Sequence, residues 1–196
     1  MIYSRTCKNS DYYDLGIDEI IREYLITEKR YENYKHSRYK FWEYAITLKL
    51  IEELKVSKVV DITLHKSDNC YDLLLKNRNI QLVQYTLDEF IALNIRENRF
   101  QFLTCFGVLD YVPKPDRIAN KMSRHLEIDG VMLITNEDNI SKTLRKSHIT
   151  PEYFLQFSLM LENEGFDIYP TNTIDRIDYE EYSNKLSSFV LQRIGK

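Results

Sequence analysis

The most informative part of the sequence is residues 99–138, RFQFLTCFGVLDYVPKPDRIANKMSRHLEIDGVMLITNED. It begins with RFQFLTCFGV (99–108), which is apolar nearly throughout, as expected of an interior parallel strand covered on both faces. Apolar residues then recur every four positions in PDRIANKMSRHL (115–126), which predicts an amphipathic helix. The IDG at 128–130 predicts a turn, and VMLIT (131–135) predicts another strand. Strand, helix and strand in this order indicate a parallel α/β unit.

The residues before this stretch continue the alternation. VSKVVDI (56–62) is a short β-branched run and predicts the first strand, and CYDLLLK (70–76) predicts a helix. NIQLVQY (79–85) predicts a second strand, and LDEFIAL (87–93) predicts a short helix. Repeated alternation of this kind favours a sheet with helices on both faces.

Two amphipathic helices are predicted at the N-terminal end, IDEIIREYLI (17–26) and RYKFWEYAITLKLIEELK (38–55). At the other end, Pro151 opens a predicted helix over residues 151–165. FDIYPTNTI and SSFVLQRI follow as two strands with no helix between them, which favours an antiparallel pair. We interpret residues 1–196 as one domain, with helices over 1–54 and an α/β core over 55–196.

Composition narrows the class of protein. Apolar residues make up 43% and charged residues 29% of the chain, as in ordinary soluble globular proteins. The formal net charge of −3 gives no overall basic field for nucleic acid or an anionic membrane. No apolar run has the length of a signal peptide or a membrane span, so we expect a cytoplasmic protein. The three cysteines are scattered and predict neither a disulfide framework nor a metal site.

Residues 99–138 resemble the second half of the class I S-adenosylmethionine-dependent methyltransferases of the small-molecule type. In that family a strand with a small turn leads into a Val-Pro-x-Pro loop, a helix ending in leucine, a glycine turn and a strand. The matching residues here are Val112, Pro113, Pro115, Leu126, Asp129 and Gly130. The resemblance implies a Rossmann-like three-layer sandwich, a mostly parallel sheet with a C-terminal antiparallel hairpin, and S-adenosylmethionine as cofactor. It also implies that the N-terminal helices form a lid.

The loop after the first strand departs from the family pattern. The resemblance implies an acid followed by three alternating glycines, because a backbone without Cβ atoms can bend beneath the cofactor. The acid is present as Asp61, but the glycine positions hold Thr63, His65 and Ser67. We therefore expect the protein to bind S-adenosylmethionine weakly or not at all.

A second anchor of the family is an acid at the end of the next strand, which binds the ribose. Here that strand ends in Gln84, Tyr85 and Thr86, none of them acidic. On another alignment, Thr86 takes the place of an acid that contacts adenine. The interval between Asp61 and Phe100 has room for one strand, whereas the family places two strands there. We therefore expect one strand fewer than the family's seven.

The remaining candidate residues lie where open α/β sheets bind ligands, at the carboxyl ends of the strands. The cofactor site is predicted from Asp61, Thr63, His65, Thr86, Cys105 and Phe106, and the substrate side from Asp110, Tyr111, Tyr39 and Trp42. Each has a structural alternative: Asp61 can brace its loop, His65 can be an ordinary loop histidine, and Cys105 can be a core residue.

Three functions stay open. The first is methyl transfer to a small molecule or a sugar, which needs positioning more than covalent help from the protein. The second is an inactive methyltransferase fold that binds or regulates a protein partner. The third is an enzyme of another class that uses His65, Asp68 and Asp110. The basic and aromatic segment KRYENYKHSRYKFWEY (29–44) can suggest single-stranded nucleic acid, but its interspersed glutamates and the negative net charge disfavour that partner.

Overall fold

The computed structural model describes residues 5–6, 16–28, 38–66, 69–95, 98–138, 166–168 and 185–194. Its strands are β1 (Arg5–Thr6), β2 (Lys58–Thr63), β3 (Gln81–Thr86), β4 (Phe100–Phe106), β5 (Leu126–Asp138), β6 (Phe166–Ile168) and β7 (Lys185–Arg193). Its helices are α2 (Ile17–Glu28), α3 (Arg38–Leu54), α4 (Asn69–Lys76), α5 (Leu87–Ala92) and α6 (Pro115–Arg124), with a 3-10 turn, η1 (Leu109–Tyr111). Each helix or strand predicted within these ranges forms within a few residues of its expected bounds.

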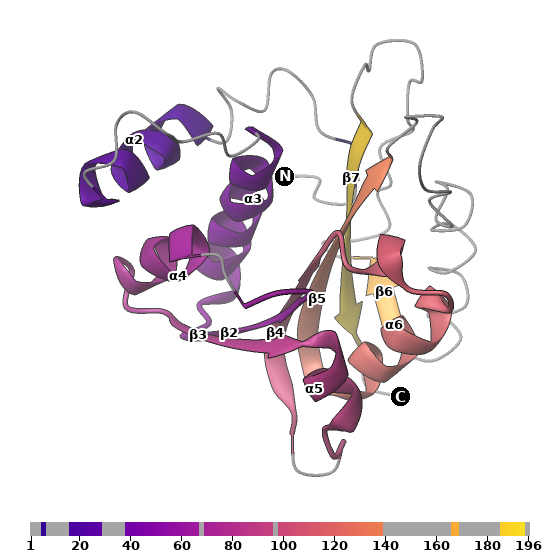
Figure 1. The fold of residues 1–196 in the computed structure, drawn as a ribbon. Coiled ribbons are helices and arrows are strands. Elements are labelled where there is room, and N and C mark those ends of the chain that lie inside the picture. Colours follow the sequence, from indigo (N-terminus) through magenta and orange to yellow (C-terminus); the bar gives the residue numbers. More distant parts are fainter. Residues whose placement is uncertain are drawn as a thin grey trace.

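All strands belong to one sheet with the order β1-β7-β5-β4-β2-β3, and β6 also pairs with β7 (Figure 1). β3, β2, β4 and β5 run parallel to one another. β7 runs antiparallel to β5, β6 and β1. The expected parallel sheet with a C-terminal antiparallel hairpin is therefore confirmed.

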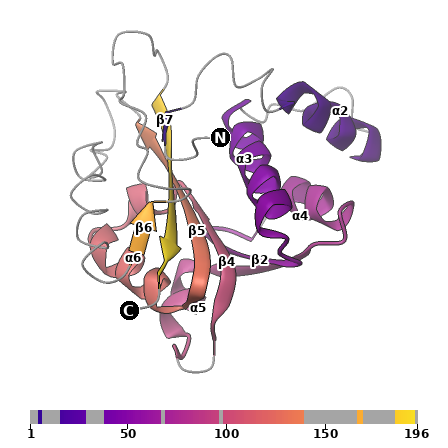
Figure 2. The same cartoon turned by 180° about the vertical axis from the view of Figure 1, so that it is seen from behind.

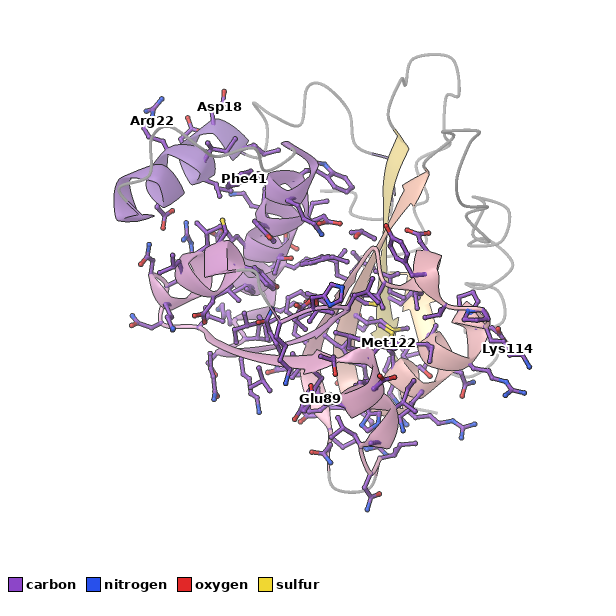
Figure 3. All side chains as sticks on the ribbon, viewed as in Figure 1. Asp18, Arg22, Phe41, Glu89, Lys114 and Met122 are labelled. Atoms are coloured by element: carbon purple, nitrogen blue, oxygen red, sulfur yellow. The ribbon has the colours of Figure 1, made fainter. Side chains whose placement is uncertain are left out.

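The helices form two layers, one on each face of the sheet (Figures 1 and 2). Side chains of α2, α3 and α4 pack with Val59 of β2, Phe102 of β4 and Val131 of β5 in one buried cluster. Side chains of α6 and the buried Phe90 of α5 pack with the alternate strand residues, such as Leu103, in a second cluster. Figure 3 shows Phe41 of α3 and Met122 of α6 on opposite sides of the sheet. This arrangement is the predicted three-layer sandwich, and it follows from the period of two along each strand.

The interval between Asp61 and Phe100 holds one strand, β3, among the residues described there. The shortfall predicted for this interval is therefore confirmed. Within the described residues the sheet nevertheless has seven strands, because the two-residue β1 pairs with β7 at the far edge. β1 was not predicted, since two residues carry no periodicity.

The predicted turn at residues 128–130 requires a correction, because it lies inside β5. Leu126 already pairs with Phe100, and the register shifts before Phe102 pairs with Val131. Asp129 has a φ of 64° in this irregular segment. A Cβ atom on Gly130 would lie 2.9 Å from the Glu127 carbonyl oxygen, so only glycine fits there. The segment is a bulge that keeps the chain in the sheet instead of ending the strand.

That the N-terminal helices form a lid stays a prediction, and the structure shows that three apolar side chains of α3 are buried. Phe41, Tyr44 and Leu48 of α3 are 2%, 2% and 5% exposed. The side chain of Lys40 is 33% exposed. Residues 29–37 of the lid segment and the helix expected over 151–165 lie outside the described residues. Within the described part of the chain, the helices are all too short or too polar to cross a membrane.

Candidate functional site

Three strands present polar side chains to α3 near their carboxyl ends. Asp61 of β2 pairs in register with Thr104 of β4, and Thr135 lies at the corresponding end of β5. All three are buried. Each follows by two positions a residue of the α3-side core, so the strand alternation directs it to the same face. A polar cluster therefore lies beneath α3, at the edge where open α/β sheets bind ligands.

Asp61 is the charged centre of this cluster and is only 4% exposed. Its carboxyl group accepts hydrogen bonds from Thr104 Oγ1 at 2.8 Å and from Gln84 Nε2 at 3.1 Å. Burial raises its pKa to about 7, although both hydrogen bonds and the charge of Lys40 act to lower it. Burial exceeds the hydrogen bonds in this balance because removing a carboxylate from water costs more than two donors restore.

A second buried acid, Glu43, lies on α3 and contacts the cluster from the helix. It is 2% exposed, and its Oε1 accepts a short hydrogen bond from Thr135 Oγ1. Its Oε2 lies 3.1 Å from Lys40 Nζ, and its backbone carbonyl accepts from Thr47 Oγ1 at 2.9 Å. Glu43 is not among the site residues predicted from the sequence. The available signal was one glutamate within the apolar run FWEYAITL.

Aromatic side chains fill the space above Asp61 and Thr104. Tyr44 of α3 and Tyr71 of α4 stack with their ring centroids 5.0 Å apart and their planes 8° apart. Phe106, the last residue of β4, contacts both rings edge-on at 6.2 and 5.5 Å. The Tyr71 hydroxyl lies 3.5 Å from Thr104 Oγ1, and burial raises the pKa of Tyr71 above its usual range. The carboxyl end of β4 is therefore covered by side chains of the protein itself.

The described residues of the loop after β2 form hydrogen bonds with one another and an ion pair with α5. Thr63 Oγ1 accepts from the His65 backbone N–H at 3.3 Å and donates to the His65 carbonyl at 3.1 Å. Lys66 Nζ forms an ion pair with Glu89 of α5 at 2.6 Å. Thr63, His65 and Lys66 all have negative φ, so the backbone differs from one that demands glycine. These three residues therefore carry none of the backbone strain that a positive φ imposes on a side chain.

Thr86, at the end of β3, has a structural role. Its side chain accepts from the Glu89 backbone N–H at 3.3 Å, and its own N–H donates to Glu89 Oε2 at 2.7 Å. These reciprocal bonds form a capping box at the start of α5. The hydroxyl that stands in place of the family's acid is thus engaged in holding a helix.

The other predicted site residues do not gather around Asp61. Cys105 is completely buried and belongs to the core on the α6 side of the sheet, and burial raises the pKa of its thiol. Trp42 is also completely buried, so it cannot meet a substrate in this structure. Asp110 and Tyr111 lie on η1 after β4, and Tyr111 is 52% exposed. The side chain of Tyr39 lies outside the described part of the chain, as do Ser67 and Asp68.

The polar and aromatic side chains at the carboxyl ends of β2, β3 and β4 already have partners within the protein. Asp61 is already bonded to two donors and shielded from water, and Thr86 caps a helix. Tyr44, Tyr71 and Phe106 pack against one another over the end of β4. A cofactor held by this edge in the manner of the family would have to displace these contacts.

Comparison with known proteins identifies the fold. The sequence matches no family model and no curated protein. The plantazolicin methyltransferase BpumL, solved in complex with a monoazolic desmethylPZN analogue and S-adenosylhomocysteine, is similar in structure, with 9% identity and a TM-score of 0.57 over 95% of this chain and 93% of its own. The CurJ carbon methyltransferase is also similar, with 9% identity and a TM-score of 0.55 over 96% of this chain and 62% of its own. The chain has the class I S-adenosylmethionine-dependent methyltransferase fold.

Proposed function

We propose that this methyltransferase-fold protein does not bind S-adenosylmethionine in the manner of the class I enzymes and acts instead as a binding or regulatory protein. The observation that supports the proposal is the state of Asp61. Its carboxyl group is 4% exposed, receives two hydrogen bonds from the protein, and has a pKa raised by burial to about 7. A partly protonated and enclosed acid is a poor acceptor for a cofactor's polar groups.

The free energy needed to break these contacts also disfavours cofactor binding. Binding at this edge would break the Tyr44–Tyr71 stack and the hydrogen bonds of Asp61. A hydrogen bond to a charged group contributes about 1.5–3 kcal/mol, and an aromatic pair contributes about 0.5–1.5 kcal/mol. Each 1.4 kcal/mol lost weakens binding about tenfold. These costs together convert a micromolar cofactor affinity into a millimolar one.

The alternative function is an active methyltransferase, and one observation favours it. The likeness to BpumL covers nearly all of both chains, and that protein was solved with S-adenosylhomocysteine. Methyl transfer depends mainly on positioning two reactants, so an altered pocket can still support it. The acceptor on this alternative is a small molecule or a sugar near Asp110 and Tyr111.

Calorimetric titration with S-adenosylmethionine and S-adenosylhomocysteine separates the two functions. We expect no binding stronger than millimolar for the wild-type protein. The informative variant carries Thr63→Gly, His65→Gly and Ser67→Gly, and its matched control carries alanine at the same three positions. Alanine removes the same side-chain groups but retains Cβ, so only the glycine variant restores the freedom of the backbone.

Micromolar binding by the wild-type protein overturns the proposal and restores the active methyltransferase. Binding by the glycine variant alone locates the obstacle in the loop after β2. Binding by none of the three proteins locates it in the enclosed Asp61 and the residues that cover β4. Both of the last two results support an inactive fold.

A further inference from the structure

Among the described strands, the sheet ends at β3 on one side, and the sequence of this strand has none of the residues that usually protect an open edge. β3 pairs only with β2 among the described strands (Figure 1). Its sequence, QLVQYT, contains no charged residue, no proline and no glycine. Natural sheets blunt an open edge with charges, prolines, bulges or a covering element, because an unprotected edge pairs with another chain. The edge of β3 therefore has the properties of a pairing surface.

The backbone groups available at this edge can be assigned. The N–H of Gln81 donates to the Ser57 carbonyl at 2.9 Å, so Gln81 directs its backbone toward β2. Backbone direction alternates along a strand, so Val83 and Tyr85 also face β2, whereas Leu82 and Gln84 face outward. The N–H of Thr86 agrees with this alternation. Like those of Leu82 and Gln84, it points away from β2, and it donates to Glu89 Oε2. Leu82 and Gln84 thus carry the backbone donors and acceptors that a new strand can use.

We propose that β3 pairs with β3 of a second copy of this chain, antiparallel about a two-fold axis, and that the two sheets become one. The most complete register places Leu82 opposite Gln84 of the second copy and Val83 opposite its own counterpart. In this register both outward residues of each strand form hydrogen-bonded pairs, and the bonded N–H of Thr86 is not required. The proposal does not depend on whether the protein binds S-adenosylmethionine.

Charge favours a second copy over an unrelated partner. The strands themselves bring no like charges together, because β3 is uncharged. Lys58 lies beside Gln81 at the start of the strand, and Asp88 follows its end. Both side chains are exposed, and neither forms an ion pair with any described residue. An antiparallel arrangement brings the Lys58 end of each copy to the Asp88 end of the other.

Packing at the axis also suits a symmetric pair. Val83 is half-buried and packs against the cluster on the α6 side of the sheet. In the proposed register the two copies of Val83 form a directly opposed, non-hydrogen-bonded pair. Such pairs have Cα atoms about 4.5 Å apart, and paired β-branched side chains at this spacing stabilise a sheet.

The first experiment measures mass by sedimentation velocity over a range of concentrations. We expect the wild-type protein to sediment with twice the monomer mass. Val83→Lys places two ammonium groups opposite each other, so we expect dimerisation to weaken about tenfold or more. The matched control is Ile128→Lys, which adds the same charge at a β5 residue that is 65% exposed. We expect this control to remain a dimer.

The second experiment tests the register by cysteine crosslinking and does not require Val83→Lys to fold. The background is Cys7→Ser, and the native Cys70 and Cys105 stay because both are buried. Val83→Cys should form an intermolecular disulfide on mild oxidation, since the spacing of a non-hydrogen-bonded pair allows one. Gln81→Cys is the control, because in this register its counterpart lies four residues away along the strand, about 13 Å.

Crosslinking of Val83→Cys without crosslinking of Gln81→Cys supports the proposal. A wild-type monomer at every concentration overturns it and assigns the edge to another kind of partner. A dimer that survives Val83→Lys as well as it survives Ile128→Lys also overturns it, because that dimer uses another surface. Equal crosslinking of both cysteine variants overturns the proposed register and with it the symmetric pairing of β3.

Discussion

On the α3 side of the sheet, Asp61 of β2 lies beside Thr104 of β4. One position further along the same strands, Ile62 lies beside Cys105 on the α6 side. The two pairs differ by one position along the strands and are all buried. One face thus encloses a carboxyl group and hydroxyls at the carboxyl ends of the strands, and the other encloses apolar side chains. The buried polar residues described on the α6 side, Ser123 and His125, belong to the end of α6.

The two faces therefore stabilise the fold by different kinds of contact, apolar packing on one face and a buried carboxyl group on the other. Burial of apolar side chains contributes to folding in the same way at every moderate pH. A buried carboxyl group contributes according to its protonation, because its folded and unfolded pKa values differ. The apolar side chains of the α6 side therefore stabilise the fold equally at these pH values, whereas Asp61 on the α3 side couples folding to pH.

The largest change in the pH dependence of the unfolding free energy is expected from Asp61→Asn. The folded pKa of about 7 lies above the ordinary value of 3.8, so the folded protein holds a proton that the unfolded chain releases. The stability linked to this proton is complete below about pH 4 and is lost as pH rises through 7, by up to about 1.4 kcal/mol per pH unit. Asparagine removes this loss, so the variant should gain stability over the wild-type protein as pH rises.

Urea denaturation from pH 4 to 8, followed by the fluorescence of Trp42, measures this effect. Trp42 is the only tryptophan and is completely buried, so it reports unfolding directly. A constant difference in unfolding free energy between the variant and the wild-type protein at all these pH values would contradict the coupling.

An intermediate effect is expected from Thr104→Val. The valine has nearly the same shape but cannot donate to Asp61 Oδ1, which accepts from Thr104 at 2.8 Å. At pH 8 the charged carboxylate loses one of its donors, and we expect the free energy of unfolding to fall by about 1.5–3 kcal/mol. At pH 5 the carboxyl group is protonated and the loss should be smaller. Thr104→Ser, which retains the hydroxyl, is the matched control. Equal losses for the valine variant at both pH values would show that the hydrogen bond is not linked to the charge of Asp61.

The smallest effect is expected from Ile134→Val on the α6 side. Ile134 is completely buried in the apolar cluster, and the change deletes one methylene group. We expect a loss of about 0.5–1.5 kcal/mol in unfolding free energy, the same at pH 5 and pH 8. Thermal melts at the two pH values check this expectation. A loss that varied with pH would show that the coupling extends through the sheet to both faces.

The sequence predicted the sheet well because its signals are local. The apolar run of β4, the β-branched run of β2 and the four-residue spacing in α6 each fit within one element. The α3-side cluster was missed because it is assembled from separate elements. Glu43 and Thr135 are 92 residues apart and meet only after α3 packs on the sheet. Asp61 was identified from the family pattern, but its enclosure by Tyr44 and Tyr71 depends on packing that no local pattern encodes.

The order of the strands along the chain has a consequence for how the molecule folds. β2, β3 and β4 follow one another closely and can pair early, because their contacts close short loops. The other edge of β5 pairs with β7, which is synthesised much later. Val131 pairs there with Gln192, and Asn136 with Ser187. During synthesis, β5 therefore leaves the ribosome well before the strand that covers it. The interval in which β5 has one bare edge is the period when the growing chain is most exposed to mispairing and to chaperones.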